Sequence, residues 1–320
     1  MRAAVVERYG GPERVHIEEV PRPTPKGDEV LVRVRAAAVT SGDARIRGAR
    51  FPKGFAVPAR LAFGLRRPRR PVLGGTFSGV VEEVGPKATG WAPGDEVCGM
   101  TGLRMGTHAE LVVVPAKRLA RKPAEVSHDD AAGVLFGGTT ALYFLRDRAP
   151  VVPGMTVLVN GASGAVGSNA VQLAKHFGAT VTGVTSEANE QLVKDLGADR
   201  VIDHTREHVV SLAERFDVVV DTVGNLSIAT GRRLLTERGV LVLAVAGLGE
   251  TLRARGNVVA GSSGERAEDF ETLLRMVADG ELRVVHDQAF PLDDIAAAYR
   301  RVDSGRKVGN VLVHPQGESQ

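Results

Sequence analysis

The chain has 320 residues, and its length and composition exclude several classes of protein. This length predicts about two domains, and 43% hydrophobic with 25% charged residues is typical of globular rather than disordered proteins. The single cysteine, Cys98, excludes an internal disulfide framework and a cysteine-rich zinc cluster. No apolar run reaches about 18 residues and none opens the sequence, so we expect no membrane span, no signal peptide and a cytoplasmic location.

The net charge of +3 conceals an uneven distribution along the chain. Residues 44–81, called the basic segment below, contain nine basic residues and no Asp or Glu, whereas the rest of the chain has 32 basic against 38 acidic residues. The nine are Arg45, Arg47, Arg50, Lys53, Arg60, Arg66, Arg67, Arg69 and Arg70. A basic segment is therefore set into an otherwise acidic protein.

Residues 1–122 are predicted to be mostly β-structure. Alternating or β-rich runs at 30–36, 77–84 and 111–114 are bounded by Gly and Pro turn signals, such as Pro93-Gly94-Asp95. Short strands separated by such turns indicate an antiparallel barrel or sandwich.

After Pro123 the pattern changes to strands that alternate with helices. Ser127 is expected to cap a helix whose first turn is acidic. The following runs predict strands at 156–160, 180–184, 201–202, 216–220 and 239–246, and helices at 166–177 and 189–196. This alternation predicts an α/β domain with a doubly wound parallel sheet. A helix over 265–278 and a strand-like run at 308–313 complete the chain.

The clearest motif is a glycine-rich turn between the strand at 156–160 and the next helix. Gly164 would let the backbone approach a pyrophosphate, Gly167 would let the helix pack on the strand, and the helix N-terminus would face the phosphates. Ala162 stands where the first glycine of G-x-G-x-x-G would be. A tight turn without a ligand is the alternative, but the flanking βαβ pattern favours dinucleotide binding.

The tip of the next strand bears on the choice between NAD and NADP. The strand ends at Thr185 and Ser186 without the carboxylate that would bind an NAD ribose, which favours NADP. Ser186 would donate to the 2′-phosphate or, equally, cap the next helix. Glu187 argues weakly for NAD.

Several motifs together resemble the medium-chain dehydrogenase/reductase superfamily, and within it the zinc-independent quinone oxidoreductase (zeta-crystallin-like) branch. They lie at 39–43, 94–97, 136–141, 161–167 and 196–203. The resemblance implies a GroES-like β-barrel catalytic domain at 1–122 and 267–320 and a Rossmann NAD(P)-binding domain at 123–266. It also implies a cleft that holds NADPH, with NADH as the alternative, and a homodimer or tetramer joined through the Rossmann domains, of which we expect the homodimer.

The resemblance also implies which residues contact the cofactor, from the phosphates to the nicotinamide. They are Ser163, Gly164, Ala165, Val166, Gly167, Thr185, Ser186, His204, Thr222, Val223, Val245, Ala246, Gly247, Ser262 and Asn310. His204 is equally well explained as a polar residue that closes a loop. Asn310 replaces a frequent lysine, and Ala188 stands where many relatives carry a cation for the 2′-phosphate.

The same resemblance argues against a metal. Zinc alcohol dehydrogenases of this superfamily have a cysteine ligand where Thr40 stands and a His-Glu pair near Gly75 and Thr76, and a lone His108 does not replace them. We expect no zinc and no flavin. Quinone oxidoreductases have Asn and Tyr near the nicotinamide where this chain has Thr40 and Arg45, so these two are the catalytic candidates, with Thr40 as hydrogen-bond donor and Tyr143 as a weaker alternative.

These observations predict hydride transfer from NAD(P)H to a quinone or an α,β-unsaturated carbonyl compound. An alcohol dehydrogenase or carbonyl reductase and a non-catalytic NADPH-binding protein are the alternatives. The basic segment is either a solvated Arg-rich loop anchored by its aromatic residues or a collar for an anionic substrate, such as an acyl-CoA, a carrier-bound acyl group or a carboxylated enone. No nucleic-acid-binding module accompanies it, so we expect no nucleic-acid partner.

Overall fold

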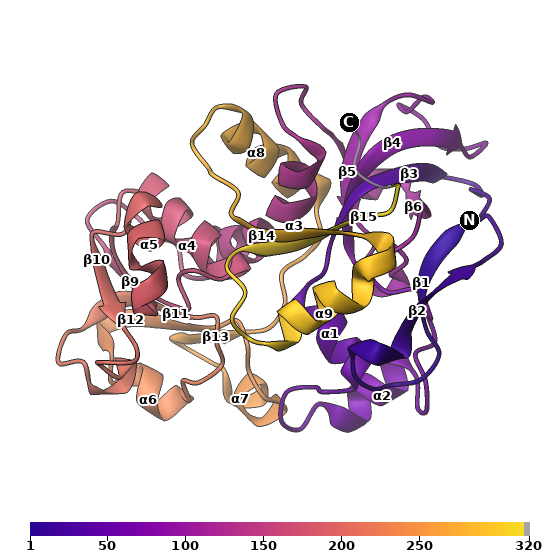
Figure 1. Cartoon of the computed structure of the whole chain (residues 1–320). Helices are drawn as coiled ribbons and strands as arrows, with labels where there is room; N and C mark the ends of the chain where they lie inside the picture. Colours follow the sequence, from indigo (N-terminus) through magenta and orange to yellow (C-terminus); the bar gives the residue numbers. More distant parts are fainter. Residues whose placement is uncertain (317–320) are drawn as a thin grey trace.

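The computed structural model describes residues 1–316, and two large sheets organise it (Figure 1). One is a six-stranded sheet in the order β10-β9-β8-β11-β12-β13, in which every neighbouring pair is parallel. Its strands are β8 (Thr156–Asn160), β9 (Thr180–Thr185), β10 (Arg200–Asp203), β11 (Phe216–Asp221), β12 (Leu235–Leu243) and β13 (Val258–Ala260). This is the doubly wound order that the alternation of strands and helices predicts.

The second sheet has seven strands and is mostly antiparallel. Its order is β14-β15-β3-β4-β5-β7, with β6 paired to β3, while β1 and β2 form a separate pair. The bounds are β1 (Arg2–Val6), β2 (Val15–Glu19), β3 (Glu29–Ala38), β4 (Thr76–Val84), β5 (Glu96–Met100), β6 (Leu111–Pro115), β7 (Leu119–Arg121), β14 (His286–Pro291) and β15 (Asn310–His314). The antiparallel structure expected for residues 1–122 is present, but β15 joins it at β3.

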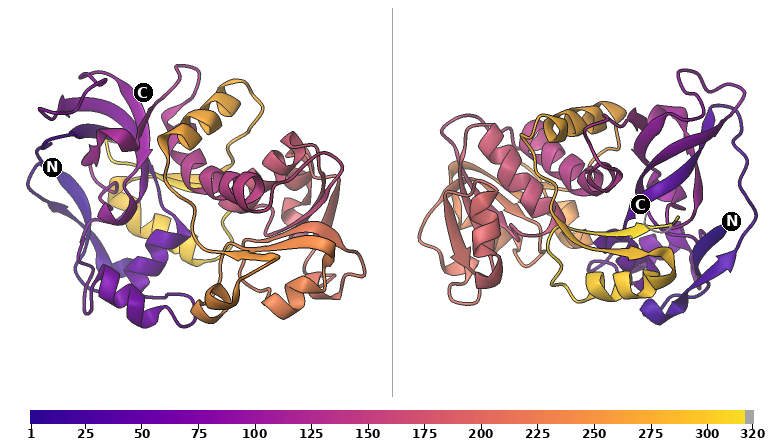
Figure 2. Two further views of the ribbon diagram at one scale, coloured as in Figure 1. Left: turned by 180° about the vertical axis from the view of Figure 1, so that it is seen from behind. Right: turned by 45° about the horizontal axis from the view of Figure 1, so that its top comes forward.

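Helix α3 (His128–Leu142) lies between the two sheets (Figure 2). Ser127 caps it as predicted, since the Ser127 hydroxyl accepts the N–H of Asp130 at 3.0 Å. The helix contacts β3 and β4 on one side and α4 (Ala165–His176) on the other. A Cβ at Gly137 would stand 2.1 Å from the carbonyl oxygen of Ala165, so glycine is what permits this close approach. The other Rossmann helices are α5 (Glu190–Asp195), α6 (Ile228–Arg232) and α7 (Leu248–Arg253).

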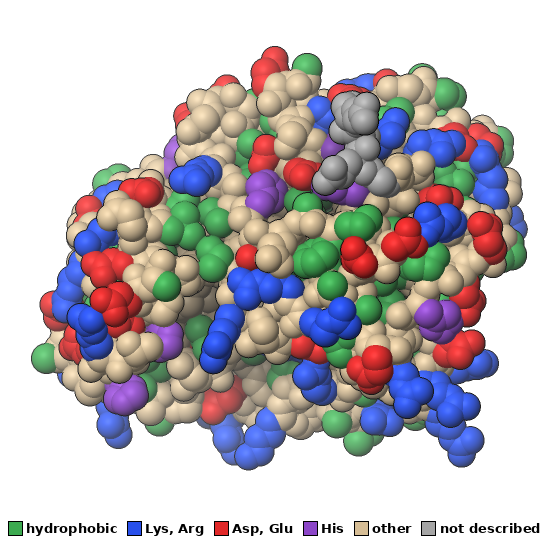
Figure 3. Space-filling model, viewed as in Figure 1, with side chains coloured by type: hydrophobic (Ala, Val, Ile, Leu, Met, Phe, Trp, Pro, Cys, Tyr) green, Lys and Arg blue, Asp and Glu red, His purple; other side chains and the backbone are tan. Residues whose placement is uncertain are grey.

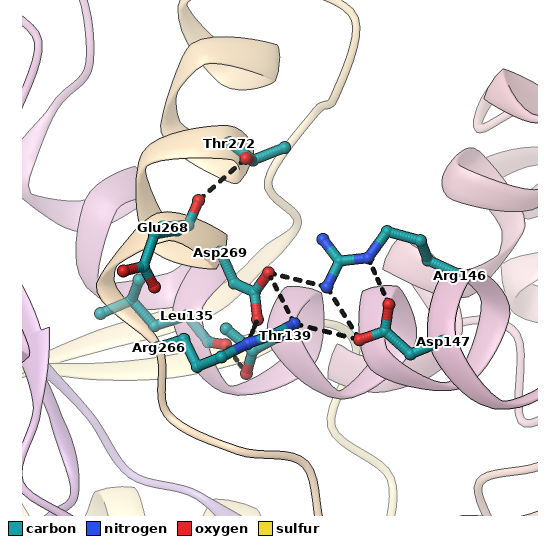
Figure 4. A network of polar contacts seen from close by, with 8 residues as sticks. All are labelled: Leu135, Thr139, Arg146, Asp147, Arg266, Glu268, Asp269 and Thr272. Carbon is teal, nitrogen blue, oxygen red and sulfur yellow. Dashed lines mark hydrogen bonds and ion pairs between the residues drawn. The ribbon is translucent and has the colours of Figure 1, made fainter.

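Helix α8 (Ala267–Ala278) is held to the end of α3 by charged side chains (Figure 4). The π-helical turn at Tyr143–Arg148 continues α3, and its Arg146 pairs with Asp269 at 2.9 Å while Asp147 pairs with Arg266 at 3.0 Å. Apolar residues of α8 belong to the same core as those of α3 and of the six-stranded sheet. The domain boundary at residue 266 remains a prediction, and α8 itself packs on α3.

Two helices, one of which begins just before the basic segment, occupy part of it, and the interpretation as a plain loop did not expect them. They are α1 (Ser41–Gly48) and α2 (Ala56–Phe63). The rings of Phe51 and Phe63 stack with centroids 6.0 Å apart, so the expected aromatic anchors are present. Helix α9 (Ile295–Asp303) packs beside α1. Across residues 1–316, no helix is both long enough and apolar enough to span a bilayer.

Candidate functional site

The glycine-rich turn connects β8 to α4, and each of its glycines has a different surrounding. Gly161 has φ +85°, which favours glycine, and a Cβ at Gly167 would stand 2.0 Å from the Gly161 carbonyl oxygen. A Cβ at Gly164 would meet only that same oxygen, at 3.4 Å. Gly167 therefore serves packing, as predicted from the sequence, whereas the backbone at Gly164 is open beside the α4 N-terminus. An open backbone next to unpaired helix N–H groups fits a pyrophosphate.

The missing first glycine of the motif is compensated by the neighbouring strand. Ala162 is fully buried, and its methyl group lies 3.1 Å from where a Cβ of Gly183 on β9 would be. The turn keeps its shape because the space for the methyl group comes from Gly183.

Three of the predicted polar residues meet at this turn. Thr185 Oγ1 donates to Ser163 Oγ at 2.8 Å, and Asn189 Nδ2 bridges Ser163 Oγ at 3.3 Å and Ser186 Oγ at 3.2 Å. Ser186 occupies the N-cap of a 3-10 turn (Glu187–Asn189), but its hydroxyl accepts no capping hydrogen bond. Asn189 was missed at the sequence level, and only its position just after the strand tip pointed to it.

A cation that the sequence analysis missed lies beside the tips of β9 and β10. Arg206 donates to Glu187 Oε1 at 2.8 Å, and its Nε lies 3.6 Å from Asp203 Oδ2. Its guanidinium is largely exposed. The side chain of His204 is exposed as well, and its backbone N–H donates to the Thr185 carbonyl at 2.9 Å.

The loop after β11 closes over the first glycine of the turn. A Cβ at Gly161 would stand 2.5 Å from Thr222 Oγ1 and 2.8 Å from Val223 Cγ2. The Thr222 hydroxyl donates to the carbonyl of Asn160 at 2.8 Å. Buried Asp221 fixes the loop because its carboxylate accepts the N–H groups of residues 223, 224 and 226.

The segment after β12 meets the basic segment of the other half. The Leu248 N–H donates to the Lys53 carbonyl at 2.8 Å, and a Cβ at Gly247 would stand 2.9 Å from that oxygen. Val245 and Ala246 are half-buried, and Val245 packs against Gly224 of the preceding loop. We call the contact of Gly247 and Leu248 with Lys53 the Lys53–Leu248 junction. Ser262 is exposed.

A second connection between the halves runs through residues 307–310. The Gly309 N–H donates to the Ser163 carbonyl at 2.8 Å, and Lys307 Nζ donates to the Gly309 carbonyl at 2.6 Å. Burial lowers the pKa of Lys307 to about 8. Asn310 is buried, and its side chain donates to the Val285 carbonyl at 3.0 Å. As the sequence resemblance implies, Asn310 replaces a lysine that is frequent in relatives. In this segment the lysine is Lys307, three residues earlier.

Thr40, the predicted hydrogen-bond donor, caps α1. Its Oγ1 donates to Asp43 Oδ2 at 2.6 Å and accepts the Asp43 N–H at 3.2 Å, while the Thr40 N–H donates to the same carboxylate at 2.8 Å. The other donor candidate, Tyr143, packs edge-on against Phe144 at 5.2 Å between ring centroids. That contact favours a packing role for Tyr143.

Arg45, the second catalytic candidate, lies one turn further along α1. Its guanidinium is half-buried, and across residues 1–316 it forms no hydrogen bond, ion pair or ring contact. Burial alone lowers the pKa of Arg45.

A separate hollow of about 30 Å³ lies beside the basic segment, and Arg45 does not line it. Its lining residues are Ile46, Ala62, Phe63, Pro68, Arg69, Arg70, Leu73, Leu103 and Met105.

Two residues of types that commonly bind zinc, Cys98 and His108, are buried and unsuited to that role. Burial raises the pKa of the Cys98 thiol to about 12, so it stays protonated. His108 is buried, with Nε2 donating to the Ala38 carbonyl at 3.2 Å and Nδ1 accepting from the Tyr299 hydroxyl at 3.2 Å. Among the described residues, the only group of three that could share a metal is the mostly exposed Glu7, His16 and Glu18, at the end of β1 and on β2.

Comparison with known families matches three descriptions to this chain. An alcohol dehydrogenase GroES-like domain matches residues 26–124, a zinc-binding dehydrogenase domain matches residues 196–313, and the C-terminal domain of alanine dehydrogenase/PNT matches residues 137–243. The first two correspond to the antiparallel sheet and to much of the parallel sheet.

Individual relatives span nearly the whole chain. It is 32% identical to a 2-methylene-furan-3-one reductase of Solanum lycopersicum over 98% of this chain and 79% of the relative. It is 31% identical to an NADPH-dependent alkenal/one oxidoreductase of Arabidopsis thaliana, over 98% and 80%. The structure of a quinone oxidoreductase from Coxiella burnetii superposes with a TM-score of 0.87 at 26% identity, covering 98% of this chain and 99% of that one.

Proposed function

The chain is an oxidoreductase of the medium-chain dehydrogenase/reductase superfamily, and we propose that it is a zinc-independent NAD(P)H-dependent reductase of quinones or α,β-unsaturated carbonyl compounds. The observation that carries the proposal is the open backbone at Gly164. The residue before it, Ser163, accepts the N–H of Gly309, which directly precedes β15, so this backbone lies beside the antiparallel sheet. A cofactor held there would lie between the two halves of the molecule. The relatives that reduce a furanone and alkenals support the acceptor class.

The residues around the turn fit a nicotinamide dinucleotide. We assign the pyrophosphate to residues 163–167, with Lys307 as the nearby cation, and the adenosine to Thr222 and Val223. Thr185, Ser186, His204 and the newly found Arg206 belong to the adenosine phosphate end, whereas Val245, Ala246 and Gly247 belong to the nicotinamide end; the roles of Ser262 and Asn310 rest on the resemblance. Arg206 and the Ser186 hydroxyl, whose proton has no acceptor in the described chain, favour NADPH, whereas Glu187 keeps NADH as an alternative.

Zinc independence is supported by the residues that stand at the positions of zinc ligands. Thr40 stands where a cysteine ligand would, Gly75 and Thr76 stand where a His-Glu pair would, and both ring nitrogens of His108 have partners. A catalytic zinc needs about three protein ligands, and these positions offer none. The match to a zinc-binding dehydrogenase domain therefore concerns its fold.

The reaction then depends on how the residues of this chain hold the acceptor. Bound NADPH supplies a hydride, and we propose no flavin. The protein positions the β-carbon of the acceptor, provides a hydrogen-bond donor for the oxygen that gains negative charge, and limits access of water. Solvent completes the protonation of the product.

We also propose a homodimer joined at the edge of the parallel sheet. Within the described residues β13 pairs only with β12, so its outer edge has free backbone groups that can pair with a second copy. Sedimentation equilibrium measures this directly, and a monomer at micromolar concentration contradicts it.

The central test is NADPH oxidation with 1,2-naphthoquinone and with an alkenal, repeated with NADH and after treatment with a chelator. We expect turnover of both acceptors, faster with NADPH, and no loss after chelation. Binding of NADPH without turnover would identify a non-catalytic binding protein. Oxidation of simple alcohols by NADP⁺ that a chelator abolishes would identify a zinc alcohol dehydrogenase.

A further inference from the structure

The Thr40 hydroxyl has no proton left for a substrate. Its single O–H donates to Asp43 Oδ2, and its oxygen already accepts the Asp43 N–H, which completes the capping box of α1. The same carboxylate also accepts the Thr40 N–H. Because Asp43 is buried, this arrangement is shielded from water, so the donor to an acceptor oxygen must come from another residue.

Arg45 is the side chain of α1 whose donors are uncommitted. The two other arginines of this stretch are neutralised, since Arg47 and Arg50 both pair with Asp303. Arg45 forms no such pair anywhere in the described chain, although its guanidinium is half-buried. Its five N–H groups are thus partly removed from water without a protein partner, which is costly unless an anion binds there.

The position of Arg45 on the helix directs it away from the barrel core. The buried face of α1 consists of Asp43, Ala44, Ile46 and Arg47. At about 100° per residue, Arg45 lies on the opposite face of the helix. A residue on that face is half-buried only because other parts of the molecule cover it.

The chain that follows α1 leads directly to the proposed nicotinamide end. Ala49, with φ +49°, turns the backbone, and the N–H groups of Ala49 and Arg50 donate to the Arg45 carbonyl. Three residues later the Lys53 carbonyl accepts the Leu248 N–H at the Lys53–Leu248 junction. In Figure 1, α1 and α2 accordingly lie beside α7, and Figure 3 shows many Lys and Arg side chains along this lower edge of the molecule.

We propose that Arg45 binds a carboxylate of the acceptor, so that the substrate class is an α,β-unsaturated carbonyl compound that carries a carboxylate. A guanidinium fork matches a carboxylate with two parallel hydrogen bonds, which a neutral quinone oxygen does not offer. No acidic side chain of residues 44–81 competes for it. This inference rests on the proposed reductase function and specifies its substrate.

The test compares trans-4-oxopent-2-enoate with its methyl ester, which keeps the reacting carbons and removes the charge. For the wild type we expect kcat/KM to be about 10- to 100-fold higher for the acid, because a hydrogen-bonded ion pair of this kind has that effect. Arg45→Gln abolishes the preference by raising KM for the acid, so that acid and ester have similar kcat/KM in that variant. Added guanidinium restores part of the acid activity of Arg45→Ala, and Arg45→Lys retains a smaller preference.

Arg275→Gln is the matched control, since Arg275 is an exposed arginine of α8 without an ion pair in the described chain and its loss changes the net charge equally. We expect it to keep the wild-type preference. The NADPH dissociation constant of each variant verifies folding. If the wild type reduces 1,2-naphthoquinone but treats acid and ester alike, or if Arg45→Gln keeps the preference, Arg45 does not bind a carboxylate. If the wild type oxidises NADPH with none of the three acceptors, the reductase function is wrong and this inference is wrong with it.

Discussion

The two ends of the candidate site are built from different parts of the chain. The proposed cofactor end is made mainly of backbone: Gly161, Gly167 and Gly309 permit close packing, and Gly164 leaves the backbone open. The proposed acceptor end depends on a side chain, the guanidinium of Arg45 on a short helix, which has no partner among residues 1–316. A site made of backbone tolerates changes in the surrounding side chains, whereas a site made of one side chain changes its ligand with one substitution. In the proposed arrangement, cofactor binding therefore depends on the backbone of one end and substrate selection on the side chain of the other.

The largest effect is expected from Gly164→Asp, which tests the cofactor end without disturbing the fold. Gly164 is the N-cap of α4 in an extended conformation, φ −78°, where Asp is favoured, so thermal stability stays level or rises by about 0.3 kcal/mol. The new carboxylate would repel the pyrophosphate, and the NADPH dissociation constant should rise at least about 100-fold. Fluorescence titration measures this change, and unaltered NADPH affinity would contradict the proposed phosphate site.

Gly167→Ala should instead damage the fold. The added methyl group would meet the Gly161 carbonyl oxygen at 2.0 Å, so α4 must move from β8, and we expect a loss of about 2–4 kcal/mol in the free energy of unfolding. Gly164→Ala is the control, because its methyl group meets the same oxygen at 3.4 Å. Urea unfolding of both variants tests the difference, and equal stabilities would show that the two glycines do not have the separate roles assigned to them.

Replacing Arg66, Arg67, Arg69 and Arg70 by Gln tests whether the acceptor end also has a long-range field. These four are exposed and have no carboxylate partner in the described chain. At low salt we expect kcat/KM for trans-4-oxopent-2-enoate to fall about 5- to 10-fold and its salt dependence to become shallower, with the methyl ester unaffected. If the salt dependence is the same in both proteins, the solvated interpretation of the segment holds and the collar does not exist.

The smallest effect concerns the pH dependence of cofactor binding. Because burial lowers the pKa of Lys307 to about 8, its ammonium is charged below that pH and neutral above it. The attraction for a phosphate is thus present at pH 7 and lost by pH 9, and NADPH affinity should fall about 3-fold across this range. Lys307→Arg stays charged and should give a flat profile. A decline of equal size in that variant would assign the pH dependence to another group.

The cofactor turn was predictable because its signal is local. The spacing of Gly164 and Gly167 between a buried strand and a helix predicts a separate role for each. The Ala162 departure could not be resolved locally, since the compensating Gly183 lies on the next strand and is recognised only when the register of β8 and β9 is known.

The remaining parts of the site depend on contacts between distant segments. Arg206 and Lys307 come to the site because parallel strands end at one edge of a sheet and because Gly309 bonds to Ser163. Nothing in the sequence near residue 206 distinguishes that arginine from others. In contrast, the sequence contains a signal for the hydrogen bonds between Thr40 and Asp43. A threonine followed three residues later by an acidic residue is close to a capping-box pattern.

The place of β15 in the antiparallel sheet has a consequence for biosynthesis. β15 pairs with β3 and carries β14 on its other side, so a sheet begun by residues 29–38 is finished by residues 286–314. The strands of the parallel sheet, from residue 156 to residue 260, are all translated before β14 and β15. On the ribosome the inserted parallel sheet can form first, while the earlier antiparallel sheet remains incomplete because β3 lacks its partner β15. A nascent chain halted after residue 280 should therefore protect its middle third from protease and leave its first third cleavable.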